Sequence, residues 1–315
     1  SRAPSFITAL PMAKRKSGTL KALLTKVKKT GQSKEPALAK KWAALKFTVR
    51  EDANGDSYVL KKIFQQNVYH RTYRKNSSLW SERGFEGRRV LDLGANIGAF
   101  SRRAMEEGAE VVAVEMDRAN FSLLKRNTAR TALSRKSAAA ATRIHAAVVA
   151  ESSGKRQIFT KAAGRAARGN PNRNSLLQDD VNPDRLAGGG VPSVALRRLL
   201  GAHGPFHLVK IDIEGYEVEL FSKLAGQKRL FDKCEVLVYF HVDKFPTVAV
   251  FASFLRRLRQ LFKVVRLETG IVGPAGMLDA AWETDVKTCP GLRFRRLPGM
   301  AGKKKDILIY CGHDA

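Results

Sequence analysis

The sequence has few cysteines, few acidic residues and no long apolar run. Its three cysteines, Cys234, Cys289 and Cys311, form no C-x-x-C pair, which argues against a disulfide framework or a zinc ribbon and suits a reducing compartment. No apolar run approaches the length of a membrane span, so we expect a soluble or peripheral protein. The 57 Lys and Arg outnumber the 29 Asp and Glu, which gives a net charge of +28. A field of that sign attracts phosphates of nucleic acid, anionic lipid or a polyanionic substrate.

Much of this charge lies at the N-terminus. Residues 1–46 hold twelve Lys or Arg and one acid, Glu35. We expect a basic extension, either an organelle transit segment (mitochondrial or plastid) or an arm that orders on RNA. A solvated tail of a cytoplasmic or nuclear protein is the plainer alternative. The chain begins at Ser1, which agrees with a presequence already removed.

Residues 47–88 are interpreted as a lead-in to the main domain. Phe47–Val49 and Tyr58–Leu60 are predicted to pair as a hairpin across the turn at residues 54–56. Residues 67–75 interleave aromatic and basic side chains. That pattern suits either stacked bases or an amphipathic surface segment.

From residue 89 to 315 the pattern alternates between strands and helices, which predicts a doubly wound, mostly parallel α/β sheet. The expected strands are 90–93, 110–115, 143–149, 207–213, 234–241 and a closing strand 306–311, and the expected helices include 99–107, 118–130 and 251–263. An insert at about 151–204 is basic near its start, where Arg165, Arg168 and Arg173 are candidate contacts to substrate or nucleic acid. Loops of this length are usually binding elements or disordered.

The stretch R-R-V-L-D-L-G-A-N-I-G-A-F-S, residues 88–101, is the first candidate site. A buried strand is followed by a turn bracketed by Gly94 and Gly98 and then by a helix N-terminus, an arrangement that presents backbone N–H groups to a ligand. The spacing is not G-x-G-x-x-G, so the dinucleotide fingerprint is absent. Asp92 is placed to accept a hydrogen bond from the amine of an amino-acid-like ligand.

The second strand ends in an acid, Glu115, at 23 residues after Asp92. Nucleotide-binding α/β folds place an acid about 20 residues on, where it accepts from the ribose hydroxyls. Met116 follows Glu115 at the edge of the expected cofactor site, where its side chain could cover the face of an adenine ring. A surface acid at a strand end is the alternative to this role.

The segment V-K-I-D-I-E-G-Y-E-V-E-L, residues 209–220, is the second candidate site. Asp212 and Glu214 are expected at the carboxyl end of the fourth strand, beside the topological switch point. Carboxylates there could orient an acceptor hydroxyl, take up its proton or ligate a metal. An ion pair between Lys210 and Glu214 is the structural alternative, and Lys210 is also a candidate substrate contact.

Together these motifs resemble the FkbM family of methyltransferases, which shows a D-x-G-A-N-x-G-x-x-S turn, an acid-ended second strand and a K-x-D-x-E-G-x-E segment. The resemblance extends loosely from Tyr58 to His241. It implies a Rossmann-like class I methyltransferase fold that uses S-adenosylmethionine to methylate mainly hydroxyl oxygens of sugars and small metabolites. By this resemblance the expected cofactor contacts are Asp92, Gly94, Asn96, Gly98, Glu115, Met116, Ala147 and Asp212. Asp212, Glu214 and His241 would line the methyl-transfer site.

Three features depart from the family pattern. Residues 195–200 read A-L-R-R-L-L where acids are usual, Tyr239 replaces an acid two residues before His241, and the tail and insert are unusually basic. The first and third departures suggest an anionic partner. The second bears on the acceptor site and on whether turnover survives.

Two functions follow from the sequence. The first is an S-adenosylmethionine-dependent methyltransferase acting on a hydroxyl of a sugar, nucleotide or RNA, with Asp212 or His241 as the base. The second is an RNA-binding or ribonucleoprotein component, organellar and ribosome-associated, on a methyltransferase fold with or without turnover. Docking on an anionic membrane is a third option. The histidines show no ligand spacing, so no metal is predicted.

Overall fold

The computed structural model describes the chain in segments. These are residues 17–19, 45–50, 54–79, 84–129, 133, 140–150, 154–156, 159–160, 174–175, 191–224, 226–242, 244–245, 247–268 and 307–313. Within them, no helix is both long and apolar enough to cross a membrane.

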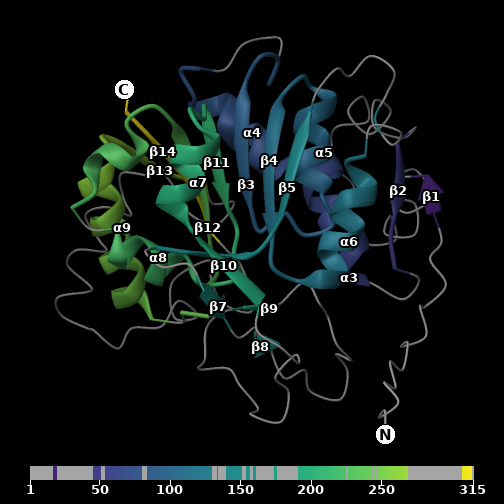
Figure 1. The fold of residues 1–315 in the computed structure, drawn as a ribbon. Coiled ribbons are helices and arrows are strands. Elements are labelled where there is room, and N and C mark those ends of the chain that lie inside the picture. Colours follow the sequence, from purple (N-terminus) through teal and green to yellow (C-terminus); the bar gives the residue numbers. More distant parts are fainter. Residues whose placement is uncertain are drawn as a thin grey trace, which may run out of the picture.

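A seven-stranded sheet forms the centre of the fold (Figure 1). Its strands, in spatial order, are β13 (Val264–Glu268), β14 (Ile307–Gly312), β12 (Glu235–Phe240), β11 (Leu208–Ile211), β3 (Arg89–Leu93), β4 (Glu110–Glu115) and β5 (Ala141–His145). Strand β14 runs antiparallel to both of its neighbours, whereas β12, β11, β3, β4 and β5 are mutually parallel. The chain moves outward from β3 to β5 and then returns to β11, so the direction of strand order reverses between β3 and β11. This is the doubly wound sheet of a Rossmann-like fold.

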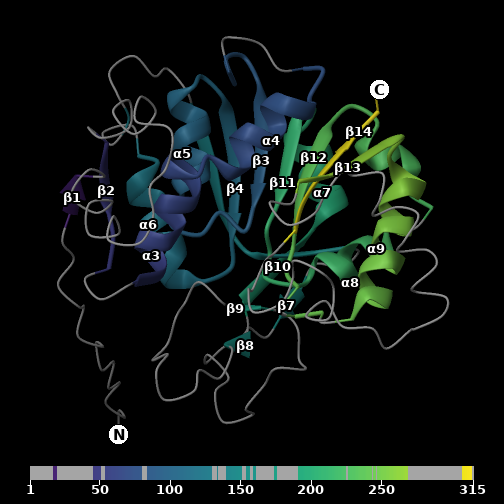
Figure 2. The same cartoon turned by 180° about the vertical axis from the view of Figure 1, so that it is seen from behind.

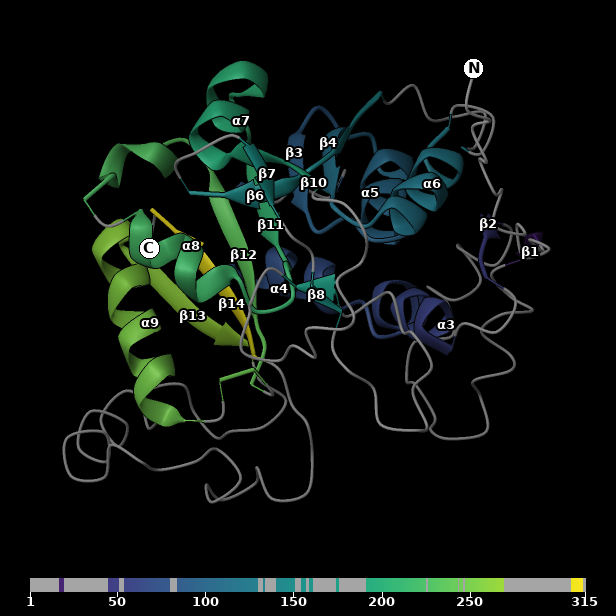
Figure 3. The ribbon, with the colours of Figure 1, turned by 60° about the horizontal axis from the view of Figure 1, so that its bottom comes forward.

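Helices cover both faces of this sheet, as two opposite views and a tilted one show (Figures 1, 2 and 3). One face carries α4 (Val68–Asn76), α5 (Ala99–Glu106) and α6 (Arg118–Asn127), and the other carries α7 (Leu196–His203), α8 (Glu217–Lys223) and α9 (Val248–Leu261). Successive residues of a strand point to opposite faces. Val90 therefore packs with the first set of helices, and Leu91 and Leu93 with the second.

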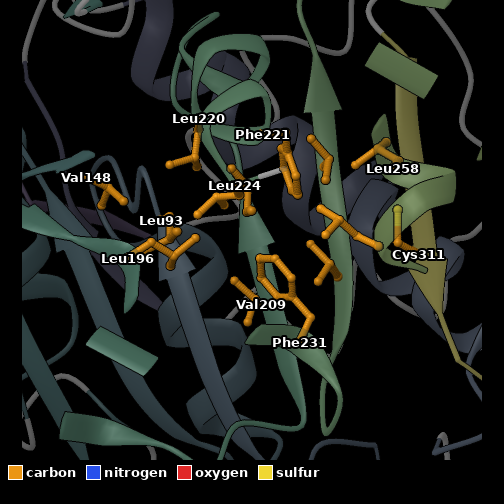
Figure 4. Packing of buried hydrophobic residues seen from close by; sticks show 14 of the residues in the cluster. Leu93, Val148, Leu196, Val209, Leu220, Phe221, Leu224, Phe231, Leu258 and Cys311 are labelled. Carbon is orange, nitrogen blue, oxygen red and sulfur yellow. The ribbon is translucent and has the colours of Figure 1, made fainter. Parts of the chain in front are cut away.

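Buried aliphatic and aromatic side chains fill the second face (Figure 4). Leu220 and Phe221 of α8 and Leu258 of α9 belong to the same buried cluster as Val209 of β11, with Leu258 on the side of Cys311. The short 3-10 helix η7 (Lys228–Phe231) contributes Phe231 to the same core. The amphipathic helix predicted at 251–263 is confirmed at Val248–Leu261, with its apolar side in this cluster.

The lead-in segment differs from the predicted hairpin. Strand β2 (Lys46–Thr48) pairs with β1 (Ser17–Thr19), and helix α3 (Asn54–Leu60) contains the residues expected to form the second strand. A π-helix, η2 (Lys61–Gln65), connects α3 toward α4. In α4 the rings of Tyr69 and Tyr73 are buried in the core. They are therefore not available to stack on bases, and the amphipathic interpretation of this segment is the correct one.

The predicted third strand divides into two. After β5 the chain bends at Ala146, and β6 (Ala147–Val149) joins a separate three-stranded sheet with β10 (Val191–Ala195) and β7 (Gly154–Arg156). A further pair, β8 (Phe159–Thr160) and β9 (Asn174–Ser175), also belongs to the predicted insert. Arg165, Arg168 and Arg173 lie outside the described residues.

Candidate active site

The glycine turn after β3 is fixed to its neighbouring strands. The backbone N–H groups of Gly94 and Ala95 both donate to the carbonyl of Val114, each at 3.0 Å. Gly94 has a φ of 73°, and a Cβ atom there would stand 1.9 Å from the carbonyl oxygen of Asp212. Only glycine fits this position, because the turn is left-handed and pressed against the end of β11. Gly98 at the start of α5 has the same conformation, with a φ of 84°.

Glu115, the last residue of β4, points its carboxylate at this turn. Its Oε2 accepts from the backbone N–H of Asn96 at 2.7 Å, and its Oε1 from that of Asp117 at 2.8 Å. Asn96 itself has a left-handed backbone, and its Oδ1 accepts from the N–H of Ile97. Burial outweighs these hydrogen bonds and raises the pKa of Glu115 to about 7. The glycine turn after β3 and Glu115 at the end of β4 are the first two predicted parts of the cofactor site. They are therefore in direct contact.

Asp92 and Lys210 form a buried ion pair across β3 and β11. They are register partners, and Lys210 Nζ lies 2.8 Å from Asp92 Oδ1. Ser101 donates to Asp92 Oδ2 at 2.6 Å, and Lys210 also donates to the carbonyl of Gly94 at 2.9 Å. The charges of both residues are satisfied inside the protein. Asp92 is fully buried beneath the turn, and Lys210 is 3% exposed, so neither presents a free charge to a ligand or a nucleic acid.

Met116 and Ala147 lie together beyond the end of β4. Met116 packs against buried Ala147 and Val191, and its carbonyl oxygen lies 3.0 Å from His145 Nε2. Both predicted residues are therefore placed on the same side of the site as Glu115.

The second cluster is centred on Asp212, which directly follows β11. His241 follows the adjacent strand β12, and its Nε2 lies 3.0 Å from Asp212 Oδ1. The other oxygen, Oδ2, accepts from Lys62 Nζ at 3.2 Å and from the hydroxyl of Tyr69. Burial alone would raise the pKa of Asp212, but Lys62 and His241 outweigh it and hold the pKa well below its usual range.

Two further carboxylates surround His241. Glu217 Oε1 lies 3.6 Å from Nε2 and Glu214 Oε2 lies 4.0 Å from Nδ1. Burial lowers the pKa of His241, yet Glu214, Glu217 and Asp212 outweigh burial and raise it to about 10. Burial raises the pKa of Glu217 to about 7. The structure therefore brings together all three residues predicted for the methyl-transfer site, Asp212, Glu214 and His241.

Sequence reasoning missed two members of this cluster. Lys62 and Tyr69 come from η2 and α4, far from Asp212 in the chain, and no motif spacing connects them. Glu217 belongs to the acidic segment predicted as the second candidate site, but sequence reasoning assigned it no separate role. The Lys62 ammonium also lies 3.3 Å from the ring centroid of Tyr239, a cation–π contact. Tyr239, which departs from the family pattern, thus packs against Lys62, and Lys62 donates a hydrogen bond to Asp212.

A profile of the methyltransferase FkbM domain matches residues 92–265. The chain belongs to the FkbM methyltransferase family. It is an S-adenosylmethionine-dependent methyltransferase with a Rossmann-like class I fold.

Solved structures similar to this family member are distant in sequence. Magnesium protoporphyrin IX methyltransferase from Synechocystis PCC 6803, solved with bound S-adenosylmethionine, is 11% identical with a TM-score of 0.41, covering 93% of this chain and 96% of that one. The putative methyltransferase yhhF from Escherichia coli is 14% identical with a TM-score of 0.38, covering 86% and 94%. A search among curated proteins finds no match.

The described residues fit the nucleoside half of S-adenosylmethionine. A carboxylate offers about four acceptor positions, and the two backbone donors to Glu115 leave positions for a ribose diol. Gly94 keeps the turn free of a side chain where the β3 and β11 ends meet. The cofactor supplies a methyl group already activated on a sulfonium, so the protein must supply alignment and an acceptor site.

Proposed function

We propose that this methyltransferase methylates a hydroxyl oxygen of a sugar, nucleotide or RNA at the cluster of Asp212, Glu214 and His241. The observation that carries the proposal is the position of this cluster. Asp212 directly follows β11 and contacts the glycine turn. The backbone carbonyl of Asp212 leaves no room for a Cβ atom on Gly94. An acceptor held by its side chain would therefore lie next to the cofactor turn.

The residues of the cluster have distinct parts in this proposal. Asp212 is held ionised and oriented by Lys62, Tyr69 and His241, so it can accept a hydrogen bond from the acceptor hydroxyl. Glu214, whose side chain is 28% exposed, is the member of the cluster that faces solvent most. Fixing the hydroxyl in line with the methyl donor is the main requirement of such a transfer.

Labelled S-adenosylmethionine with hydroxyl-bearing sugars, nucleotides and RNA tests this proposal. We expect Asp212→Asn to lower kcat by about 10²–10⁴-fold while cofactor affinity is retained. Asp232→Asn, which changes an exposed acid, is the matched control and keeps full activity. Circular dichroism of both variants reports folding. Methylation confined to nitrogen or carbon atoms, or full activity in Asp212→Asn, would contradict the proposal.

We further propose that the methyl acceptor, or a partner that carries it, is anionic, with RNA or a ribonucleoprotein favoured over a membrane surface. The net charge of +28 supports this. In helix α9, Arg256, Arg257 and Arg259 are exposed, opposite the buried apolar side. A surface of this sign attracts anionic groups such as phosphates.

A further inference from the structure

Three side chains of the acidic cluster are arranged as ligands around a common point. Asp212, Glu217 and His241 each offer one oxygen or nitrogen, and these atoms all lie within 4.8 Å of one another. They come from three elements: the end of β11, the first turn of α8 and the end of β12. Two carboxylates and an imidazole form a common ligand set for divalent metal ions.

Glu217 carries an unsatisfied oxygen in this cluster. The residue is 1% exposed. Its Oε1 accepts from the backbone N–H of Ile213 at 2.7 Å, whereas its Oε2 has no hydrogen-bond partner within the described part of the chain. A buried carboxylate oxygen without a partner is costly, and a cation bound beside His241 and Asp212 would satisfy it.

The two separations that involve His241 match those between ligand atoms around one ion. His241 Nε2 lies 3.0 Å from Asp212 Oδ1 and 3.6 Å from Glu217 Oε1. Two ligand atoms bonded to one ion at ~2.0–2.2 Å, with angles between about 90° and 110°, are roughly 2.8–3.6 Å apart. Small side-chain adjustments would therefore complete the coordination.

The charge balance of the cluster also favours a divalent cation. When all three carboxyls are deprotonated, as ligation of a metal requires, Asp212, Glu214 and Glu217 carry three negative charges, and Lys62 forms an ion pair with Asp212. A cation would bind the neutral imidazole and release the proton that His241 otherwise holds. In that metal-binding form the sum is 1 − 3 = −2, which a divalent cation offsets. Lys210 is neutralised by Asp92. Lys244, which also acts on Glu214, is partly exposed, so solvent screens its contribution.

We propose that the chain binds one divalent cation of the Mn²⁺ or Zn²⁺ type between Asp212, Glu217 and His241. This replaces the sequence-based prediction that no metal is bound, which rested on histidine spacing alone. The imidazole disfavours Mg²⁺ and Ca²⁺, which prefer all-oxygen ligand sets. A bound cation would also coordinate the acceptor oxygen and lower the pKa of its hydroxyl; this catalytic half rests on the proposed function.

Mn²⁺ titration followed by electron paramagnetic resonance tests the site without any activity assay. We expect the full chain, treated with a chelator and dialysed, to remove about one equivalent of the free Mn²⁺ signal. Glu217→Gln and His241→Gln should each weaken binding by at least about tenfold. Glu219→Gln is the control, because it lies on the same helix but pairs with exposed Lys223. Thermal melts verify that all variants are folded.

An undiminished Mn²⁺ signal, or equal binding by Glu217→Gln and the parent chain, would overturn the metal site. A second measurement addresses the catalytic half: the chelator-treated enzyme should transfer methyl groups at least about tenfold more slowly and recover with Mn²⁺. Mn²⁺ binding without such recovery would overturn that half. Mn²⁺ binding without methylation of any hydroxyl would instead refute the proposed function and leave the metal site standing.

Discussion

At the scale of single residues, Glu115 is a cofactor-site group whose charge responds to pH near neutrality. It is 6% exposed and accepts from two backbone N–H groups, yet burial still raises its pKa to about 7. The carboxyl is therefore mostly neutral below this pH and mostly ionised above it. Only the ionised form offers all its lone pairs to the hydroxyls of a ribose.

We therefore expect cofactor affinity to fall as the pH is lowered through 7. If only the ionised form binds, the dissociation constant rises about tenfold between pH 8 and pH 6. Isothermal titration calorimetry with S-adenosylhomocysteine measures this change. Glu115→Gln should bind weakly at both pH values and lose the dependence. Glu110→Gln, at the exposed start of the same strand, should behave as the parent; pH dependence retained in Glu115→Gln would exclude Glu115 as the titrating group.

The sequence indicated which residues would gather at the strand ends, but not how they would pair. Asp212 and His241 could be predicted to lie together, because parallel strands end at one edge of the sheet. The partnership of Asp92 with Lys210 depends on the register of β3 against β11, which no local pattern specifies. Lys62 and Tyr69 reach Asp212 only through the packing of the preceding helices.

At the scale of secondary-structure elements, the glycine turn joins the two halves of the site. Its backbone is bonded to β4 and packed against the residue that follows β11. The strand–turn–helix sequence was predictable because buried parallel strands give short apolar runs and glycines mark the turn. Helix α3 was not predicted, because Asn54 and Gly55 carry a strong hairpin-turn signal. Packing of the segment against the sheet overrides that local preference.

Replacement of Gly94 tests the importance of this close approach. We expect Gly94→Ala to lower the free energy of unfolding by about 2–4 kcal/mol, because φ is 73° and the new Cβ would meet the Asp212 carbonyl at 1.9 Å. Urea denaturation measures the loss. Gly201→Ala in helix α7 is the control, since a Cβ there meets nothing within 4 Å. Equal stability of the two variants would show that the turn and the β11 end are not pressed together.

At the scale of the whole molecule, the excess of positive charge is the main feature that the family does not explain. The mostly parallel sheet with helices on both faces follows from the alternating pattern, and residues 92–265 match the family. The charge of +28 belongs to the surface and to segments outside the described residues. Composition predicts the sign of a partner's charge but carries no information about the partner's structure.

If the partner is RNA, binding should weaken steeply with salt. We expect at least about a tenfold loss of affinity between ~50 and ~200 mM salt, because phosphate contacts release counterions. Filter binding or fluorescence anisotropy over a salt series gives the slope. Replacing Arg256, Arg257 and Arg259 by Gln should flatten it. A salt-independent affinity, or a slope unchanged by these substitutions, would argue against an RNA surface on α9.

Two of the hydrogen bonds to Asp212 come from residues that lie outside the segment matched by the family. Lys62 and Tyr69 precede the segment that defines the family, and strand β14 follows it. A polypeptide trimmed to that segment would keep the glycine turn, Glu115 and His241, but Asp212 would lose two of its three side-chain partners. Residues that precede the matched segment therefore complete the surroundings of Asp212, and a substitution in η2 or α4 can change this site without touching any motif of the family.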